Sequence, residues 1–98
     1  MALKIKIPKR INVLGKIISI RFDDRLDNQG LAGFYEPATS RIYLNPNAPD
    51  IEQTYVHELI HCVCHRAGIN QVISRHAEEI VAENIATVVC EVLLKIKR

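Results

Sequence analysis

Hydrophobic and polar residues alternate through the first half of the chain in a pattern typical of short strands. Three segments show it: Lys16–Phe22, Leu31–Tyr35 and Arg41–Leu44. Between the last two, Glu36–Ser40 predicts a hairpin turn. Ile11–Leu14 extends the first strand in this interpretation, with Gly15 as a bulge. We therefore expect a small three-stranded, mainly antiparallel sheet.

The spacing of apolar residues becomes helical from Ile51. Asp50 is a natural N-cap for this helix, and Gly68 is a natural terminator. Ser74 is a second N-cap. The helix that follows it carries a wide apolar stripe, which we expect to be buried: Val81, Ile85, Val88, Val89, Val92, Leu93 and Ile96. Three strands followed by two helices predict the α+β class.

Composition indicates one globular domain over residues 1–98, with 48% hydrophobic and 24% charged residues. Thirteen basic and eleven acidic residues leave a net charge of +2, which disfavours a nucleic-acid partner. The opening MALKIKIPKR lacks the apolar core of a secretory signal, and no apolar run approaches the roughly 20 residues of a membrane span. The odd number of cysteines, with Cys62 and Cys64 two residues apart, favours reduced thiols. We expect a cytoplasmic protein without a membrane partner.

The clearest chemistry lies in HELIH, residues 57–61, within the first predicted helix. His57 and His61 are four residues apart, so their imidazoles share one helix face and can converge on Zn²⁺. Glu58 projects to one side of this pair, where it can take a proton from a zinc-bound water. The motif therefore predicts zinc-dependent peptide-bond hydrolysis. The alternative is an amphipathic helix whose histidines only pack or cap carbonyl groups.

A catalytic zinc needs a third protein ligand. The metzincin extension is absent, because Cys64 and Ala67 stand where that motif requires Gly and His. His65 continues the histidine column, but three histidines in one column span about 12 Å, too far for one ion. The second helix offers three candidate carboxylates: Glu78, Glu79 and Glu83.

Helical spacing separates these three carboxylates. Glu78 points near the centre of the apolar stripe, and Glu79 points towards one edge. Glu83 is four residues after Glu79, where it can accept a hydrogen bond from a ligating imidazole. Small Ala82 and Ala86 follow Glu79 and allow the helices to approach closely. These features favour Glu79, with Glu78 as a serious rival and Glu83 as the third alternative.

HELIH followed by EEIVAENIA resembles the gluzincin clan of zinc metallopeptidases, in which a glutamate helix supplies the third ligand. The run GFYEPATSRIYLNPNAPDIEQTYVHELIH and the short chain resemble the minigluzincin-like proteins of prokaryotes and phages. The resemblance covers about residues 30–96. It implies His57, His61 and Glu79 as zinc ligands and Glu58 as general base. It also implies that Arg41–Leu44 is an edge strand that receives an extended peptide, for which the equal alternative is an interior strand of the small sheet.

The expected function is therefore that of a minimal zincin-like, zinc-dependent metallopeptidase acting on a peptide or protein substrate. Larger peptidases of this clan close the cleft with a further lobe, so we also expect weak or latent activity, or a protein partner that completes the cleft. The alternative is a zinc-stabilised module that binds peptides without cleaving them, against which the intact Glu58 argues. Four side chains are candidate donors to the reaction's oxyanion: Tyr43, Tyr55, His65 and His76.

Overall fold

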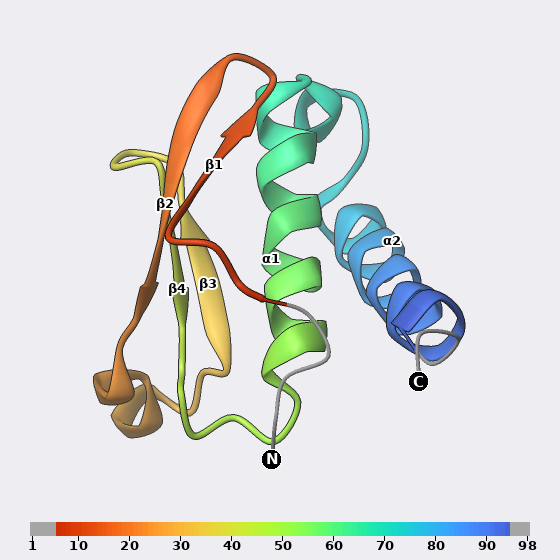
Figure 1. The fold of residues 1–98 in the computed structure, drawn as a ribbon. Coiled ribbons are helices and arrows are strands. Elements are labelled where there is room, and N and C mark those ends of the chain that lie inside the picture. Colours follow the sequence, from red (N-terminus) through yellow and green to blue (C-terminus); the bar gives the residue numbers. More distant parts are fainter. Residues whose placement is uncertain (1–5, 95–98) are drawn as a thin grey trace.

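The computed structural model describes residues 6–94, which form a four-stranded mixed sheet packed against two helices (Figure 1). The first five residues and Ile96 lie outside the described part. The strands are β1 (Arg10–Val13), β2 (Lys16–Phe22), β3 (Gly33–Glu36) and β4 (Arg41–Leu44). The helices are α1 (Ile51–Arg66) and α2 (Arg75–Val88), which continues as the π-helical segment η3 (Val89–Leu94). Two 3₁₀ turns complete the chain: η1 (Asp24–Gln29) and η2 (Ile69–Gln71). The expected α+β class is confirmed.

The sheet has the strand order β1-β2-β4-β3, one strand more than expected. Pairs β1–β2 and β3–β4 are antiparallel, and the central pair β2–β4 is parallel. Leu14 and Gly15 have φ values of 49° and 85°, the left-handed conformation that closes a tight hairpin between β1 and β2. The predicted bulge at Gly15 was therefore wrong, because this glycine turns the chain and makes Arg10–Val13 a separate strand.

The apolar core lies between the sheet and α1. Alternate residues of β2 and β4 point to this side, as the two-residue period of a strand requires. The buried core consists of these residues, one residue of β1 and two of α1: Val13, Ile18, Ile20, Ile42, Leu44, Tyr55 and Cys62. Figure 1 shows α1 between the sheet and α2. One side of the HELIH helix is thus anchored in the core, and its other side is left for the site.

The edge strand on the site's side of the sheet is β3 and not β4. Arg41–Leu44 pairs with β2 on one side and with β3 on the other, so its predicted position as an edge strand was wrong. A Cβ at Gly33 would lie 2.8 Å from Thr54 Cγ2 and 2.8 Å from the Tyr43 carbonyl oxygen. Only glycine therefore lets the start of β3 approach α1 this closely.

Both predicted helix caps are present. The Asp50 side chain accepts a hydrogen bond from the Gln53 N–H at 3.3 Å, and Ser74 Oγ accepts one from the Ala77 N–H at 3.0 Å. These caps begin α1 and α2 at the residues that the sequence predicts.

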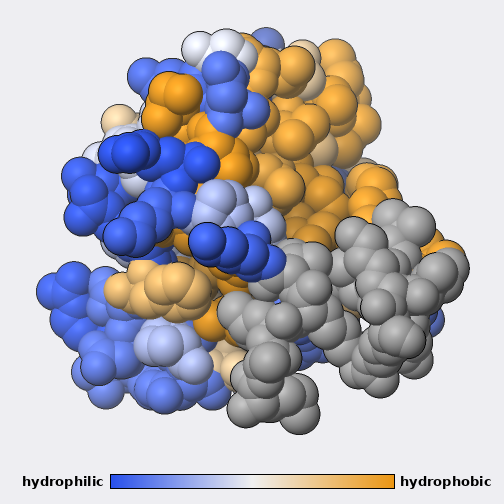
Figure 2. All heavy atoms as spheres, viewed as in Figure 1, coloured by the Kyte–Doolittle hydropathy of each residue, from blue (hydrophilic) through white to orange (hydrophobic). Residues whose placement is uncertain are grey.

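The apolar stripe of α2 is largely exposed, which contradicts its predicted burial. Val81, Ile85, Val88 and Val92 are 40%, 45%, 56% and 48% exposed, whereas Ala82 and Ala86 are fully buried. The reason is that α2 turns its glutamates and small alanines towards α1. Figure 2 shows hydrophobic side chains gathered over the two helices.

The three cysteines are free, with Cys62 and Cys64 buried and Cys90 half-buried. Within residues 6–94, no helix is both long enough and apolar enough to cross a membrane.

Candidate metal centre

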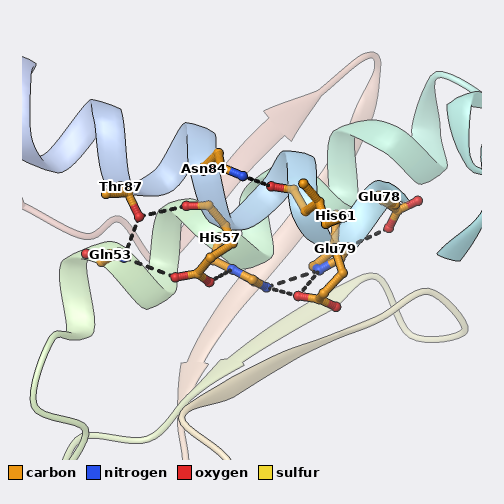
Figure 3. Close-up of polar contacts among 9 residues, drawn as sticks. Gln53, His57, His61, Glu78, Glu79, Asn84 and Thr87 are labelled. Carbon is orange, nitrogen blue, oxygen red and sulfur yellow. Dashed lines mark hydrogen bonds and ion pairs between the residues drawn. The ribbon is translucent and has the colours of Figure 1, made fainter. Parts of the chain in front are cut away.

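Two histidines of α1 and one glutamate of α2 bring their ligand atoms together (Figure 3). His57 and His61 are one helical turn apart, and their Nε2 atoms are separated by 3.2 Å. Glu79 Oε1 lies 2.6 Å from His57 Nε2 and 3.4 Å from His61 Nε2. The three residues thus form a group that could hold a metal ion, with all ligand atoms within 4.8 Å of one another.

The spacing and chemistry of these three atoms fit zinc. A tetrahedral Zn²⁺ with bonds of about 2.0–2.1 Å holds its ligand atoms about 3.3 Å apart. Two of the three separations, 3.2 Å and 3.4 Å, match that value, and the third, 2.6 Å, is a hydrogen-bond length. Two imidazoles and one carboxylate are also the ligand set of one class of catalytic zinc sites.

The outer nitrogen of each imidazole is held by another glutamate. Glu83 Oε2 lies 3.0 Å from His57 Nδ1, and Glu78 Oε2 lies 2.5 Å from His61 Nδ1. A carboxylate at Nδ1 fixes the orientation of the ring and directs Nε2 towards a metal. The three candidate glutamates therefore have different positions: Glu79 lies between the Nε2 atoms, and Glu78 and Glu83 lie behind the rings.

The contact between Glu78 and His61 was missed by the sequence reasoning, which expected only Glu83 in such a position. A signal was present, because a carboxylate at Glu78, inside an apolar stripe, requires a charged or hydrogen-bonding partner. The side chain is 14% exposed, and the His61 imidazole is that partner.

A hydrogen-bonded group ties the Glu83 end of the site to α1. Gln53 Nε2 donates to Glu83 Oε1 at 3.4 Å and to Thr87 Oγ1 at 3.1 Å. The Thr87 hydroxyl in turn donates to the Glu83 carbonyl oxygen at 2.8 Å (Figure 3). Because Gln53 belongs to α1 and its partners to α2, this group fixes the two helices against each other beside His57.

Electrostatics at the centre follow from this arrangement. Burial lowers the pKa of His61, but the hydrogen bond to Glu78 and the negative charge of Glu79 outweigh it, so the pKa is raised. Burial raises the pKa of Glu79, but the His61 and His57 imidazoles outweigh it and the pKa is lowered. The carboxylates of α2 thus favour the protonated form of the His61 imidazole on α1, and the imidazoles favour the ionised form of Glu79.

Glu58 lies in the same cleft but outside the converging group of three. It is only 8% exposed, and burial raises its pKa, an effect that the nearby His57 and His61 imidazoles oppose. A buried carboxylate with a raised pKa is a better proton acceptor than a solvated one. This side chain has the surroundings of a general base.

The centre opens into a cleft of about 720 Å³ between α1, the start of α2 and strand β3. Glu58, His61 and Glu79 form its floor, and Tyr35, His65 and Arg75 are among its walls. On the other side of His57 a second hollow of about 320 Å³ is lined by Asp50, Gln53 and Glu83. Gly33 borders both hollows, so together they form a path along the beginning of β3.

Of the four expected oxyanion donors, His65 is the one that lines the cleft. Its Nδ1 lies 3.0 Å from the Tyr35 hydroxyl. Tyr55 is buried in the core, and Tyr43 stacks on Phe34 with ring centroids 5.0 Å apart. Tyr35 and Arg75 were not singled out from the sequence, because nothing in their local pattern shows that they face the histidines.

Comparison with protein-family models, with curated proteins and with solved structures finds no match for this chain. The functional argument therefore rests on the geometry of the site and on the HELIH motif.

Proposed function

We propose that the protein is a zinc-dependent metallopeptidase of the gluzincin type. The observation that carries the proposal is the convergence of His57 Nε2, His61 Nε2 and Glu79 Oε1 within 4.8 Å, beside a buried glutamate. The resemblance of HELIH and EEIVAENIA to the gluzincin motifs supports the same ligand set. A buried carboxylate next to the three ligands is needed for hydrolysis and has no purpose in a purely structural zinc site.

His57, His61 and Glu79 would hold the zinc ion, which when bound would supply Lewis acidity and a water of lowered pKa. Glu58 accepts a proton at its carboxylate from the attacking water and passes it to the departing amine. Glu78 and Glu83 keep the two imidazoles oriented through their Nδ1 atoms.

The substrate in this proposal is a peptide in extended conformation bound to β3. Among residues 6–94, β3 pairs with one strand only, β4, so its other side is an open edge that can accept strand addition. On this side the Tyr35 backbone N–H donates to the Glu58 carboxylate. Gly33 borders both hollows around His57, so a peptide along β3 passes the metal centre. The role expected for Arg41–Leu44 thus belongs to Gly33–Glu36.

The test is to replace Glu58 by Gln and measure zinc content and hydrolysis of an unstructured protein. Glu58→Gln should retain about one zinc per chain and lower the rate by about 10²–10⁴-fold, because it removes the base and leaves the ligands. His57→Ala is the matched control and should lose the metal and the activity together. A Glu58→Gln variant that lost zinc as completely as His57→Ala would contradict the assigned role.

The second candidate is a zinc-stabilised module that binds peptides and does not cleave them. It is favoured by the small apolar contact of α2, in which Ala82 and Ala86 are the buried residues, since a bound metal would then stabilise the fold. Peptide binding that is equal in wild type and Glu58→Gln, without cleavage by either, would support it. Activity that appears only with a second protein would support a partner that completes the cleft.

A further inference from the structure

The geometry points to Arg75 as a specificity-determining residue, which binds a carboxylate of the peptide at one end of the cleft. This inference rests on the proposed function, because it concerns the substrate of the same site. Arg75 is the first residue of α2 and lines the larger hollow together with His61 and Glu79.

The guanidinium group of Arg75 has no partner among the side chains that the structure describes. Glu78 and Glu79 lie three and four residues further along the same helix, the spacing at which arginine and glutamate normally pair. Their carboxylates turn instead to the imidazoles, at 2.5 Å from His61 Nδ1 and 2.6 Å from His57 Nε2. Among the described residues, Arg75 has no hydrogen bond or ion pair, so its positive charge remains available in the cleft.

The surroundings of Arg75 favour a carboxylate as its ligand. A guanidinium binds a carboxylate through two parallel hydrogen bonds, a geometry that a neutral amide does not match. Asn70 and His65 line the same hollow and offer further polar groups, and Leu31 and Pro37 provide apolar walls. The Arg75 side chain is exposed, so we expect its pairing with a carboxylate to contribute modestly to binding.

The two hollows also differ in charge, which orients the peptide. The smaller hollow, beyond His57, is lined by Asp50 and Glu83 and has no basic side chain apart from the histidine. Glu58 lines both hollows, and the larger one is also lined by Glu78 and Glu79, whose carboxylates are paired with the histidines. Arg75 is the basic side chain that distinguishes the larger hollow, so an acidic group is favoured at that end. The preferred substrate therefore carries its carboxylate on the His61 side of the metal centre.

The test measures peptide binding and not turnover. The zinc-loaded Glu58→Gln protein is titrated with fluorescent peptides that carry Asp, Asn or Lys at each position in turn. Each peptide is made as a free acid and as an amide, so that a side-chain carboxylate is distinguished from a C-terminal one. At one peptide position we expect Asp to bind about fivefold more tightly than Asn. If the bound carboxylate is the C-terminal one, the free acid should instead bind about fivefold more tightly than the amide. Arg75→Glu in the same protein should reverse the preference in favour of Lys.

Arg10→Glu is the matched control, because it makes the same change in charge on β1, the far edge strand of the sheet. It should leave the preference unchanged. Glutamate is favoured in the first turn of a helix, so Arg75→Glu should fold and keep its zinc.

Equal binding of acidic and neutral peptides, an unchanged preference in Arg75→Glu, or no binding at all would overturn the inference. Failure of the proposed function has a different signature. In that case wild type cleaves none of the peptides, while the Arg75-dependent preference in binding persists.

Discussion

The two sides of α1 are held in different ways. Towards the centre of the sheet, the contacts are apolar, and Ile42, Leu44 and Cys62 are completely buried. Towards the edge strand β3, the Tyr35 hydroxyl adds a polar contact with His65. Towards α2, the buried apolar residues of that helix are two alanines. The polar contacts join two histidines to three glutamates, and Gln53 to Glu83 and Thr87. The larger apolar residues of α2 face away from α1 and are 40–56% exposed at Val81, Ile85, Val88 and Val92.

The apolar contacts with the sheet therefore stabilise the fold, whereas the polar contacts with α2 form the candidate metal centre. Burial of large aliphatic side chains stabilises a fold by about 1.5–3 kcal/mol each, whatever ligand is present. Exposed ion pairs contribute about 0–1 kcal/mol each, and Glu79 and Glu83 are 55% and 60% exposed. We therefore expect the sheet and α1 to be stable without metal, and the position of α2 to depend on the ion that its glutamate and the histidines would share.

The largest expected effect is that of zinc on α2. Zinc at a thousand times its dissociation constant should stabilise the protein by about 4 kcal/mol. Without zinc, backbone amides of α2 should exchange with solvent faster than those of β2 and β4, and zinc should narrow that difference. Hydrogen exchange with and without a chelator measures both.

Glu79→Ala should abolish the effect of zinc on exchange and on thermal unfolding. Glu91→Ala is the matched control, because this glutamate lies in η3, outside both hollows of the site. If the backbone amides of α2 and of the sheet exchanged equally slowly without metal, the proposed difference between the two sides of α1 would be wrong.

The second effect concerns the sheet side alone. Leu44→Ala should lower the free energy of unfolding by about 3 kcal/mol, because it leaves a cavity at a fully buried position. The loss should be nearly the same with and without zinc, because Leu44 belongs to the core and lines neither hollow of the site, although it pairs with Gly33. Urea unfolding under both conditions measures it, and a loss that changed with zinc would show that the two sides are coupled.

The sheet side was largely predictable from the sequence. Lys16–Phe22 and Arg41–Leu44 form strands at the predicted residues, because their alternation matches a sheet with one buried face. The fourth strand and the parallel central pair were missed. Strand pairing depends on the path of the chain between strands, and the strand pattern of Lys16–Phe22 is the same beside a parallel or an antiparallel neighbour.

The sequence predicted the side chains that converge from both helices, including Glu79 and the small Ala82 and Ala86 of α2, but not which larger residues of α2 are buried. The four-residue spacing of His57 and His61 brings their imidazoles together on α1 alone. The apolar stripe of α2 was expected to be buried, and this prediction was wrong. Periodicity shows that a helix has an apolar face, but it does not show which face packs against the neighbouring helix. In α2, the face with Glu79 and Ala82 meets α1.

A smaller effect tests the close approach of the two helices. Ala82→Leu should lower stability by about 2 kcal/mol, because a larger side chain at this fully buried position forces α2 away from α1. It should also weaken zinc binding, since Glu79 is three residues earlier on the same helix. Val88→Leu, at a 56% exposed position of α2, is the control and should change neither quantity. Zinc affinity that survived Ala82→Leu unchanged would show that the glutamates do not need this contact.

The smallest expected effect is that of a polar contact on the sheet side. Asp27 in η1 accepts hydrogen bonds from Asn45 Nδ2 at 2.6 Å and from Asn47 Nδ2 at 2.8 Å, and these bonds lower its pKa. A lowered pKa in the folded state stabilises the protein above the unfolded value of about 3.9, and this contribution is lost as the pH falls through the folded value. Asp27→Asn places an amide nitrogen opposite one of the two donors, so it should be slightly less stable than wild type at pH 7 and nearly equal to it at pH 2. Urea midpoints at both pH values measure the difference. A pH-independent gap, or a loss as large as that of Leu44→Ala, would show that polar contacts hold the sheet side as they hold α2.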